Sequence, residues 1–423
     1  MSIARGPIYG LFTYIGVFYL HPPSRWWGEA LPDLRWVFLA AGVTLISMII
    51  HSKDAPKQRP WIRTTPGLIM VLFTLWYWVI YFWALVPDRH IDGGVLITKY
   101  ILVFWMIYHI INTQEKVTAF LFAHFFGCVY LGLLAWGFEG GGRLNGVGGP
   151  GINDANTLGM QFSTGVIAGA MLMFLYRIKI WFALAPAIAM SLNGLILTGT
   201  RGGFLALICG GGMLYLLKPH KRTGLFYLGA ILALGLLGYV ASETFWDRIQ
   251  TIAPTETEVR DTSAQARLAL FSAQWEMSQA HPLGTGHRGT EALSHDYLDP
   301  IYMSRDGGAR SSHNVILTVL VEQGWPGLIL MGALALWCGL TLVRLKRHAR
   351  HTDDFTLGVH VAAIGGVLGV VFAGGIFADF SKCEVQIWFF ALLAALREQT
   401  RAVPAESRRE SREPYAAQQL NPA

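Results

Sequence analysis

The sequence predicts an all-α polytopic membrane protein, and three observations support this class. Hydrophobic residues make up 53% of the 423-residue chain and charged residues only 14%, whereas about a quarter of a soluble domain is charged. Apolar runs of about 20 residues, long enough to span a bilayer, recur along the chain. Lys and Arg cluster in alternate short loops between these runs. The composition excludes a disordered chain and a disulfide-rich secreted scaffold.

Twelve apolar segments are candidate transmembrane helices. The first and last are short, and a break at Gly199–Arg201 divides a stretch that is too long for one span. In chain order, the predicted spans are about 7–20, 34–50, 66–86, 95–113, 117–138, 156–176, 180–198, 202–217, 224–241, 325–343, 356–378 and 385–396. An even number of spans places both termini on the same side of the membrane.

The positive charge predicts the orientation, because short loops rich in Lys and Arg face the cytoplasm. With both termini inside, the cytoplasmic segments hold 20 of the 33 basic residues. These are Arg5, Lys53, Lys57, Arg59, Arg63, Lys116, Arg177, Lys179, Lys218, Lys221, Arg222, Arg344, Lys346, Arg347, Arg350, Arg397, Arg401, Arg408, Arg409 and Arg412. The positive excess behind the net charge of +6 therefore lies mainly in the cytoplasmic loops and tail, where it sets the orientation and contacts anionic membrane lipid. We expect no nucleic-acid partner.

Residues 1–396 are predicted to form a single transmembrane domain, and residues 397–423 a disordered cytoplasmic tail. The domain includes an external loop at 242–312. This loop has 71 residues, far more than a typical connection. It carries apolar side chains such as Phe271 and Trp275, so we expect it to be partly helical and to pack on the membrane domain.

The sequence Ser311-Ser312-His313-Asn314 ends the external loop and leads into an apolar segment and then Gly324-Trp325-Pro326-Gly327. Ser311 or Ser312 is expected to cap a short helix that begins at His313. The Gly-Trp-Pro-Gly turn would break this helix before the tenth span. His313 would then be held at the membrane surface, where a histidine can accept and return a proton. Alternatively, His313 is a helix-capping or surface residue without a catalytic role.

Arginines at the outer helix ends are candidate anion ligands. Arg201 lies in Thr198-Gly199-Thr200-Arg201-Gly202-Gly203 at the start of the eighth span, where amides and a guanidinium can bind an anion. Alternatively, the segment is a simple hairpin whose arginine reaches lipid headgroups.

The external loop carries six further arginines, whose guanidinium groups match phosphate oxygens. Ten acidic residues share the loop and can pair with some of these arginines, so we expect only two or three of them to contact a ligand. The six are Arg248, Arg260, Arg267, Arg288, Arg305 and Arg310.

A glycine-rich stretch from 140 to 151 opens the sixth span, with Asn153 or Asp154 as the expected N-cap. We favour a capping and turn role for this stretch over substrate contact, and Asn156 is a candidate supporting residue of the site.

Paired aspartates are absent from the outer helix ends, which argues against a metal-dependent transferase. Walker A, Gly-x-Ser-x-Gly and His-Glu-x-x-His patterns are also absent.

Together these motifs resemble the O-antigen ligase family, bacterial inner-membrane proteins that share the Wzy-C region. His313-Asn314, followed after nine residues by Gly324–Gly327, matches the His-Asn…Gly-x-x-Gly signature of the family. Arg201 with Leu205 matches its Arg-x-x-x-Leu motif, and an arginine-rich loop lies between the two motifs. The stretch Asn153–Asn156 also looks like an Asn-containing segment of the family. The resemblance is specific over about 150–330.

The resemblance implies a GT-C-like fold, a periplasmic active site and glycosyl transfer that needs neither metal nor cofactor. The donor would be a glycan on undecaprenyl pyrophosphate, and the acceptor a sugar hydroxyl of lipid A–core oligosaccharide in lipopolysaccharide biosynthesis. His313 would be the base of an inverting displacement. The donor would be bound by Arg201, Arg267 and Arg288, and the supporting residues would be Asn314, Arg310, Asn156, Gly324 and Gly327. The alternatives are a polymerase or a protein O-oligosaccharyltransferase of the same superfamily, or, in a different class, a lipid-linked glycan transporter.

Overall fold

The computed structural model describes residues 2–53, 56, 58–138, 142–149, 151–176, 178–224, 227, 235, 262–303, 310, 312, 314–378 and 383–402. Every regular element within these residues is a helix, which confirms the predicted all-α class. The long helices are α2 (Pro7–Leu20), α3 (Trp36–Ile50), α4 (Thr65–Ile80), α5 (Pro87–Ile110), α6 (Gln114–Ala135), α7 (Ala155–Met173), α8 (Ile178–Thr198), α9 (Arg201–Leu217), α12 (Thr262–Ala280), α15 (Gly324–His351), α16 (Phe355–Gly374) and α17 (Val385–Ala402). The short helices are α1 (Ser2–Arg5), α13 (Gly289–Tyr297) and α14 (Val315–Glu322), and single 3-10 turns lie at Pro22–Ser24, Trp26–Ala30, Trp61–Arg63, Tyr81–Trp83 and Pro300–Tyr302.

Eleven of the twelve predicted spans correspond to helices, and the predicted span 224–241 lies largely outside the described residues. Among the described residues, six helices are long and apolar enough to cross a membrane: α4 (with the following 3-10 turn), α5, α6, α8, α15 and α16. Helices α3 and α9 are apolar but shorter. The polytopic membrane class is therefore confirmed, while the total of twelve spans stays a prediction.

Several helix boundaries differ from the prediction. Helix α5 begins at Pro87, eight residues before the predicted span at 95, because proline fits the first turn of a helix. Helix α17 continues to Ala402, past the predicted start of the tail at Arg397. Residues 403–423 of the predicted tail lie outside the described residues.

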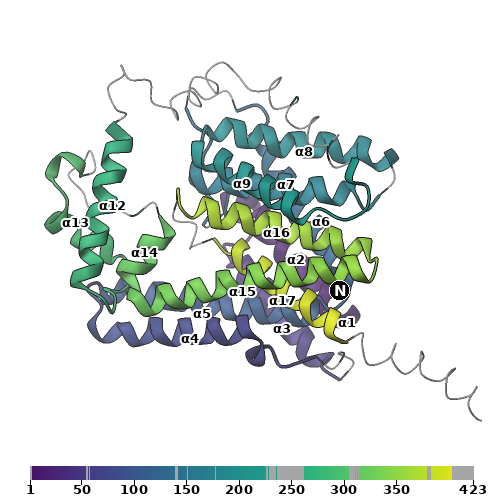
Figure 1. Ribbon diagram of the computed structural model, residues 1–423, viewed down its shortest axis with the longest axis horizontal. Coiled ribbons are helices and arrows are strands. Elements are labelled where there is room, and N and C mark those ends of the chain that lie inside the picture. Colours follow the sequence, from purple (N-terminus) through teal and green to yellow (C-terminus); the bar gives the residue numbers. More distant parts are fainter. Residues whose placement is uncertain are drawn as a thin grey trace, which may run out of the picture.

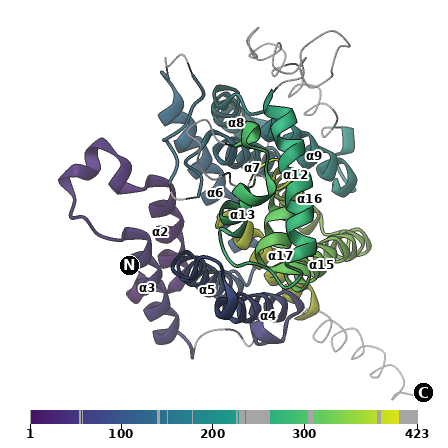
Figure 2. The same ribbon diagram turned by 90° about the vertical axis from the view of Figure 1, so that its left-hand side faces the viewer.

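Helix α16 lies at the centre of the bundle and packs against α7, α9, α15 and α17 (Figure 1). Small residues allow this close packing: a Cβ added to Gly210 of α9 would lie 2.9 Å from the carbonyl oxygen of Gly366. Close approach of backbones at glycine is a common way for membrane helices to associate. The helices of the external loop, α12 and α13, pack with α14 at one end of the bundle (Figure 1), the end that faces the viewer in Figure 2.

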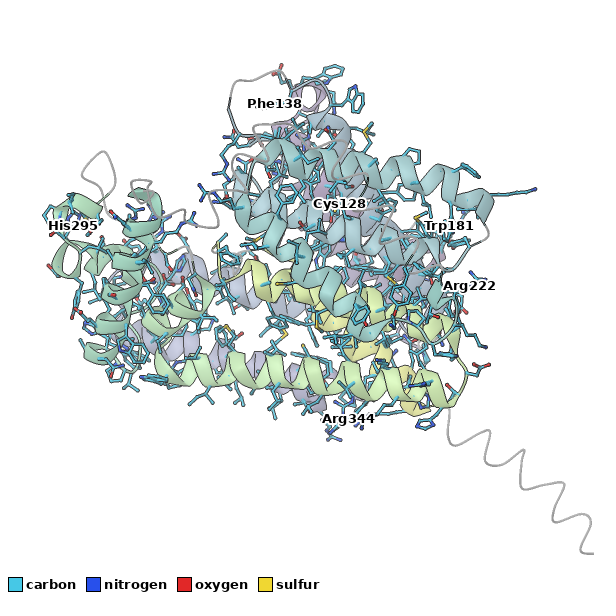
Figure 3. All side chains as sticks on the ribbon, turned by 45° about the horizontal axis from the view of Figure 1, so that its top comes forward. Cys128, Phe138, Trp181, Arg222, His295 and Arg344 are labelled. Atoms are coloured by element: carbon cyan, nitrogen blue, oxygen red, sulfur yellow. The ribbon has the colours of Figure 1, made fainter. Side chains whose placement is uncertain are left out.

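Loop contacts distinguish two ends of the bundle. At the end that carries α12–α14, which we call the site end, the amide of Val315 donates to the carbonyl of Gly375 (2.7 Å). At the other, the basic end, Asp353 accepts a hydrogen bond from Lys221 (2.5 Å). His295 of α13 and Arg222 mark these opposite ends in Figure 3. Each contact joins two loops at the same end, and both the full topology and the cytoplasmic assignment of the basic end remain predictions.

Candidate functional site

The short helix that follows the predicted catalytic histidine is capped by Asn314. Its Oδ1 accepts hydrogen bonds from the amides of Ile316 (2.9 Å) and Leu317 (3.1 Å), so α14 begins at Val315. The predicted start at His313 with a serine cap is therefore wrong. The hydroxyl of Ser312 accepts from the amide of Asn314 (3.2 Å), the residue before the helix, and donates to Oε1 of Gln274 on α12 (3.2 Å). His313 itself and Ser311 lie outside the described residues.

The starts of α14 and α9 meet the same turn, which follows α16. The amide of Val315 donates to the carbonyl of Gly375 (2.7 Å). On α9, a Cβ added to Gly202 would lie 2.8 Å from Cβ of Phe377. The segment 375–377 thus brings the N-terminal end of α14, next in the chain to His313, near the N-terminal end of α9, which begins at Arg201.

Arg201 is the half-buried first residue of α9. The preceding Thr200 caps the helix: its Oγ1 accepts from the amide of Gly203 (3.4 Å) and donates to Oδ1 of Asn156 (3.0 Å). Asn156 Oδ1 also accepts from Nη2 of Arg143 (2.7 Å). Asn156 therefore fixes the first turn of α9 relative to α7, which is a supporting position like the one predicted for it.

The N-cap of α7 is Asp154 and not Asn153, since the Asp154 carboxylate accepts from the amides of Asn156 (2.9 Å) and Thr157 (3.2 Å). Arg143 was not a sequence candidate. Its Nε also donates to the carbonyl of Thr198 (2.9 Å). A lone arginine inside the glycine-rich stretch was the signal that could have identified it.

Arg267 lies on α12, the helix that also contacts Ser312 through Gln274. Its side chain is exposed. Positions seven residues apart share one face of a helix and are separated by roughly 10 Å along its axis. Arg267 and Gln274 therefore lie on the same face of α12. An exposed arginine on this face is available for a ligand beside the 312–314 segment.

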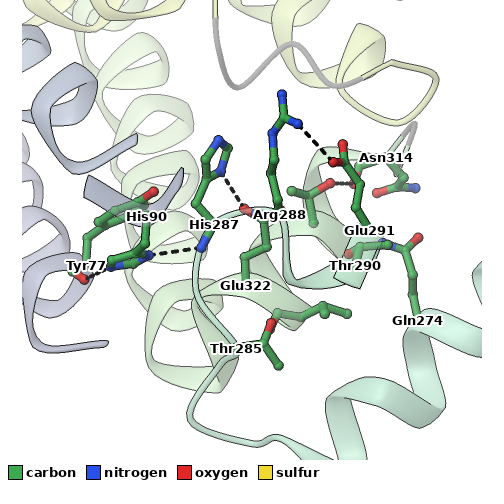
Figure 4. Close-up of polar contacts among 12 residues, drawn as sticks. Tyr77, His90, Gln274, Thr285, His287, Arg288, Thr290, Glu291, Asn314 and Glu322 are labelled. Atoms are coloured by element: carbon green, nitrogen blue, oxygen red, sulfur yellow. Dashed lines mark hydrogen bonds and ion pairs between the residues drawn. The ribbon is translucent and has the colours of Figure 1, made fainter. Parts of the chain in front are cut away.

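A chain of polar contacts lies at the other end of α14 (Figure 4). Glu322 is 6% exposed. Its Oε1 accepts from the amide of Arg288 (2.9 Å), and its Oε2 lies 3.0 Å from Nδ1 of His287. The amide of His287 donates to Nδ1 of His90 (3.0 Å), and Nε2 of His90 contacts the carbonyl of Tyr77 (2.8 Å). Because a carbonyl only accepts, Nε2 of His90 carries the proton.

This chain of contacts fixes the segment Pro282–Arg288 on the junction of α14 and α15. The amide of Thr285 donates to the carbonyl of Val321 (3.0 Å), and the amide of Trp325 donates to the carbonyl of Pro282 (3.0 Å). Glu322, His287 and His90 were not among the site residues predicted from the sequence. A buried acid in an apolar helix was the only signal, because the partners lie far away in the chain.

The first glycine of the Gly-x-x-Gly motif serves this junction. Gly324 has φ +68°, and an added Cβ would lie 2.4 Å from the carbonyl oxygen of Pro282. The predicted helix break falls at Gln323, and Gly324–Gly327 form the first turn of α15. At Gly327 a Cβ would lie 2.3 Å from Cβ of Gln323. Both glycines are thus sites of close packing.

The two remaining predicted arginines are tied into the external loop. Arg288 has φ 63° and precedes α13, and its Nη1 lies 3.3 Å from the Glu291 carboxylate. Its side chain is 42% exposed, so it remains accessible to a ligand. Arg310 donates through Nη1 to the carbonyl of Tyr302 (2.7 Å), while its amide donates to Oγ of Ser294 (3.2 Å). Arg310 therefore holds the loop together.

The predicted residues thus form two neighbouring groups, one at each end of α14. Arg201, Asn156 and Asn314 gather around its start, and Arg288 and Gly324 lie at its end. Within the described ranges, no group of three or more His, Cys, Asp or Glu side chains is arranged to hold a metal ion. Metal-independent chemistry stays a prediction.

Comparison with known proteins supports the sequence-based assignment. Residues 186–332 match the Wzy_C family model, described as O-Antigen ligase. The match covers Arg201, Arg267 and Arg288 as well as the His313-Asn314 motif, and confirms the resemblance. No curated protein matches the chain. The chain therefore carries an O-antigen ligase-type region, which is characteristic of membrane glycosyltransferases.

Proposed function

We propose that the protein is an O-antigen ligase. It transfers a glycan from undecaprenyl pyrophosphate to a sugar hydroxyl of lipid A–core at the periplasmic side of the bacterial inner membrane. The Wzy_C match supports the reaction class. One observation supports the proposal most directly: the first residues of α14 and of α9 both contact the turn at 375–377. The segment next to His313 and the segment that holds Arg201 therefore lie near one another at the site end.

In this proposal, Arg201 and the first turn of α9 bind the pyrophosphate of the donor. The unpaired amides and the helix dipole at a helix N-terminus favour an anion there. A guanidinium adds paired hydrogen bonds to phosphate oxygens. Arg267, exposed on α12, and Arg288 contribute further positive charge from the external loop. These groups stabilise the negative charge that develops on the leaving group.

His313 acts as the general base. The acceptor hydroxyl oxygen attacks the anomeric carbon while its proton moves to the imidazole. The bond between that carbon and the phosphate oxygen breaks, and undecaprenyl pyrophosphate leaves with the electron pair. The attack comes from the face opposite the leaving group, so the anomeric configuration inverts. The balance of atoms and charge in this step requires no redox partner and no cofactor.

The test is transfer in vitro with the purified full-length protein, undecaprenyl-pyrophosphate glycan and lipid A–core, with and without EDTA. We expect lipid A–core that carries the glycan, in equal yield in both arms. Loss of product with EDTA would overturn the metal-independent mechanism. Longer glycan chains on the donor, formed without lipid A–core, would instead identify a polymerase.

His313→Ala tests the base assignment in the same assay. General-base catalysis is worth about 100-fold or more in rate, so we expect at least that loss of turnover. His295→Ala is the matched control, because His295 is an exposed histidine on α13 of the same loop. It should keep the rate of the unaltered protein. Near-normal turnover of folded His313→Ala would reject the assignment.

A further inference from the structure

A narrow polar cleft lies at the basic end, far from the candidate site. It is formed between the start of α4, the middle of α15 and the end of α17, and is partly open to solvent. These three helices lie side by side in Figure 2. The residues that line the cleft include Arg59, Thr65, Trp337, Arg397, Glu398 and Arg401.

Positive charge dominates this cleft. Three arginines line it, and the one acid, Glu398, is already paired with Arg401 at 2.8 Å. Burial and the neighbouring charges of Arg401, Arg344 and Arg59 lower the pKa of Arg397. The single Glu398 carboxylate offsets only part of this positive charge, and a bound anion would offset more of it. Thr65, the first residue of α4, lines the same wall.

Trp337 provides an independent indication of a ligand. Its side chain is 6% exposed, and its indole Nε1 is buried without a hydrogen-bond partner among the described residues. A buried donor left without an acceptor is destabilising. The guanidinium of Arg397 lies 5.9 Å from the centre of the Trp337 ring. An acceptor oxygen in the cleft would satisfy the indole and also meet the arginines.

The surroundings of the cleft favour a lipid over a free ion. Leu336 and Leu340 on α15, either side of Trp337 in sequence, are 63% and 47% exposed. Leu68 in the first turns of α4 is 48% exposed. These apolar side chains offer a surface for acyl chains beside the polar cleft. Basic pockets between transmembrane helices are a known kind of headgroup site.

We propose that this cleft binds the phosphate of an anionic phospholipid, with the acyl chains lying against α4 and α15. Arg397 and Arg401 contact the phosphate oxygens, and Trp337 donates its indole N–H to one of them. The site is independent of glycosyl transfer and lies at the opposite end of the bundle.

The test is native mass spectrometry of the full-length protein in detergent, titrated with dioleoyl phosphatidylglycerol, dioleoyl phosphatidylcholine or inorganic phosphate. We expect selective retention of phosphatidylglycerol. The double variant Arg397→Gln/Arg401→Gln should weaken it about 30-fold, given what two basic groups contribute near an anionic lipid. Trp337→Phe keeps the ring and should weaken it about fivefold, the loss of one hydrogen bond. Arg350→Gln, an exposed basic-end control outside the cleft, should bind normally.

Each other outcome overturns a part of the proposal. Equal retention of phosphatidylcholine would reject the dependence on anionic charge. Binding of inorganic phosphate as tight as that of the lipid would identify a free-phosphate site instead. Unchanged phosphatidylglycerol binding in both the double variant and Trp337→Phe would reject the site itself. Trp337→Phe keeps the test informative if the double variant fails to fold.

Discussion

Glu322 shows how a single residue can join the external loop to the membrane domain. Its carboxylate is 8% exposed and contacts both His287 and the amide of Arg288. Removal of this carboxylate leaves the amide of Arg288 and Nδ1 of His287 without their hydrogen-bond partner at a buried position. We therefore expect Glu322→Ala to lower the free energy of unfolding by about 3 kcal/mol, measured by thermal or denaturant unfolding in detergent.

Glu291→Ala is the matched control for this change. Glu291 also contacts the Arg288 segment, but through an exposed side-chain pair at 3.3 Å. Exposed pairs contribute less than about 1 kcal/mol. A loss of stability in Glu291→Ala equal to that in Glu322→Ala would mean that burial of the Glu322 carboxylate is not the cause.

Arg201 is the residue on which the proposed donor site most depends. Arg201→Lys keeps the positive charge but removes the planar, paired donor geometry that fits a pyrophosphate. We expect kcat/KM for the undecaprenyl-pyrophosphate donor to fall about 100-fold, with the KM for lipid A–core nearly unchanged. The measurement is initial transfer rates with each substrate varied in turn.

Arg35→Lys is the control for Arg201→Lys, since Arg35 is an exposed arginine that precedes α3. It should leave both kinetic parameters unchanged. A rise in the KM for the acceptor in Arg201→Lys, without an effect on the donor, would move Arg201 to the acceptor side of the site.

At the scale of elements, the junction of α14 and α15 determines where the external loop sits. Gly324 is the critical residue, because its φ of +68° disfavours a side chain and its Cβ position lies 2.4 Å from the Pro282 carbonyl oxygen. Gly324→Ala should therefore lower the free energy of unfolding by about 3 kcal/mol, from backbone strain and overpacking together. Unfolding followed by intrinsic tryptophan fluorescence measures this change.

The same helix provides the control, Gly332→Ala. A Cβ at Gly332 would meet no atom within 4 Å, and alanine is favoured over glycine in a helix interior by about 1 kcal/mol. Stability should stay the same or rise slightly. If Gly324→Ala behaved like Gly332→Ala, the close contact between the Pro282 segment and α15 would be wrong.

The helix positions could be predicted from the sequence better than the contacts of the candidate site. A membrane helix needs an apolar run whatever its neighbours are, so α6 and α16 lie close to their predicted ranges. Capping depended on tertiary contacts: the amide of Val315 donates to the carbonyl of Gly375, and Asn314 caps the next two amides of α14. The pairing of His287 with His90 joins residues 197 positions apart. No local pattern encodes such a contact, and only tertiary packing produces it.

At the scale of the whole molecule, charge is divided between the two ends. Helix α15 shows the division within one element. It begins at the site end with uncharged Gly324–Gly327 and finishes at the basic end with Arg344, Lys346, Arg347 and Arg350. The proposed donor site and the proposed lipid site thus lie at opposite membrane surfaces. A glycosyl transfer in the periplasm requires the site end to face outward, so the orientation of the bundle is a condition of the proposed function.

Cysteine labelling in spheroplasts tests that orientation. Asp296→Cys on α13 and Ser52→Cys after α3 replace exposed residues at the site end and the basic end, respectively. Of the native cysteines, three are buried and Cys209 lies within the apolar helix α9, so the unaltered protein should give little background. Because basic loops remain in the cytoplasm, a membrane-impermeant maleimide should label Asp296→Cys in intact spheroplasts and Ser52→Cys only after permeabilisation. Labelling of Ser52→Cys in intact spheroplasts would invert the topology. The arginines and His313 would then face the cytoplasm, where a periplasmic ligase could not use them.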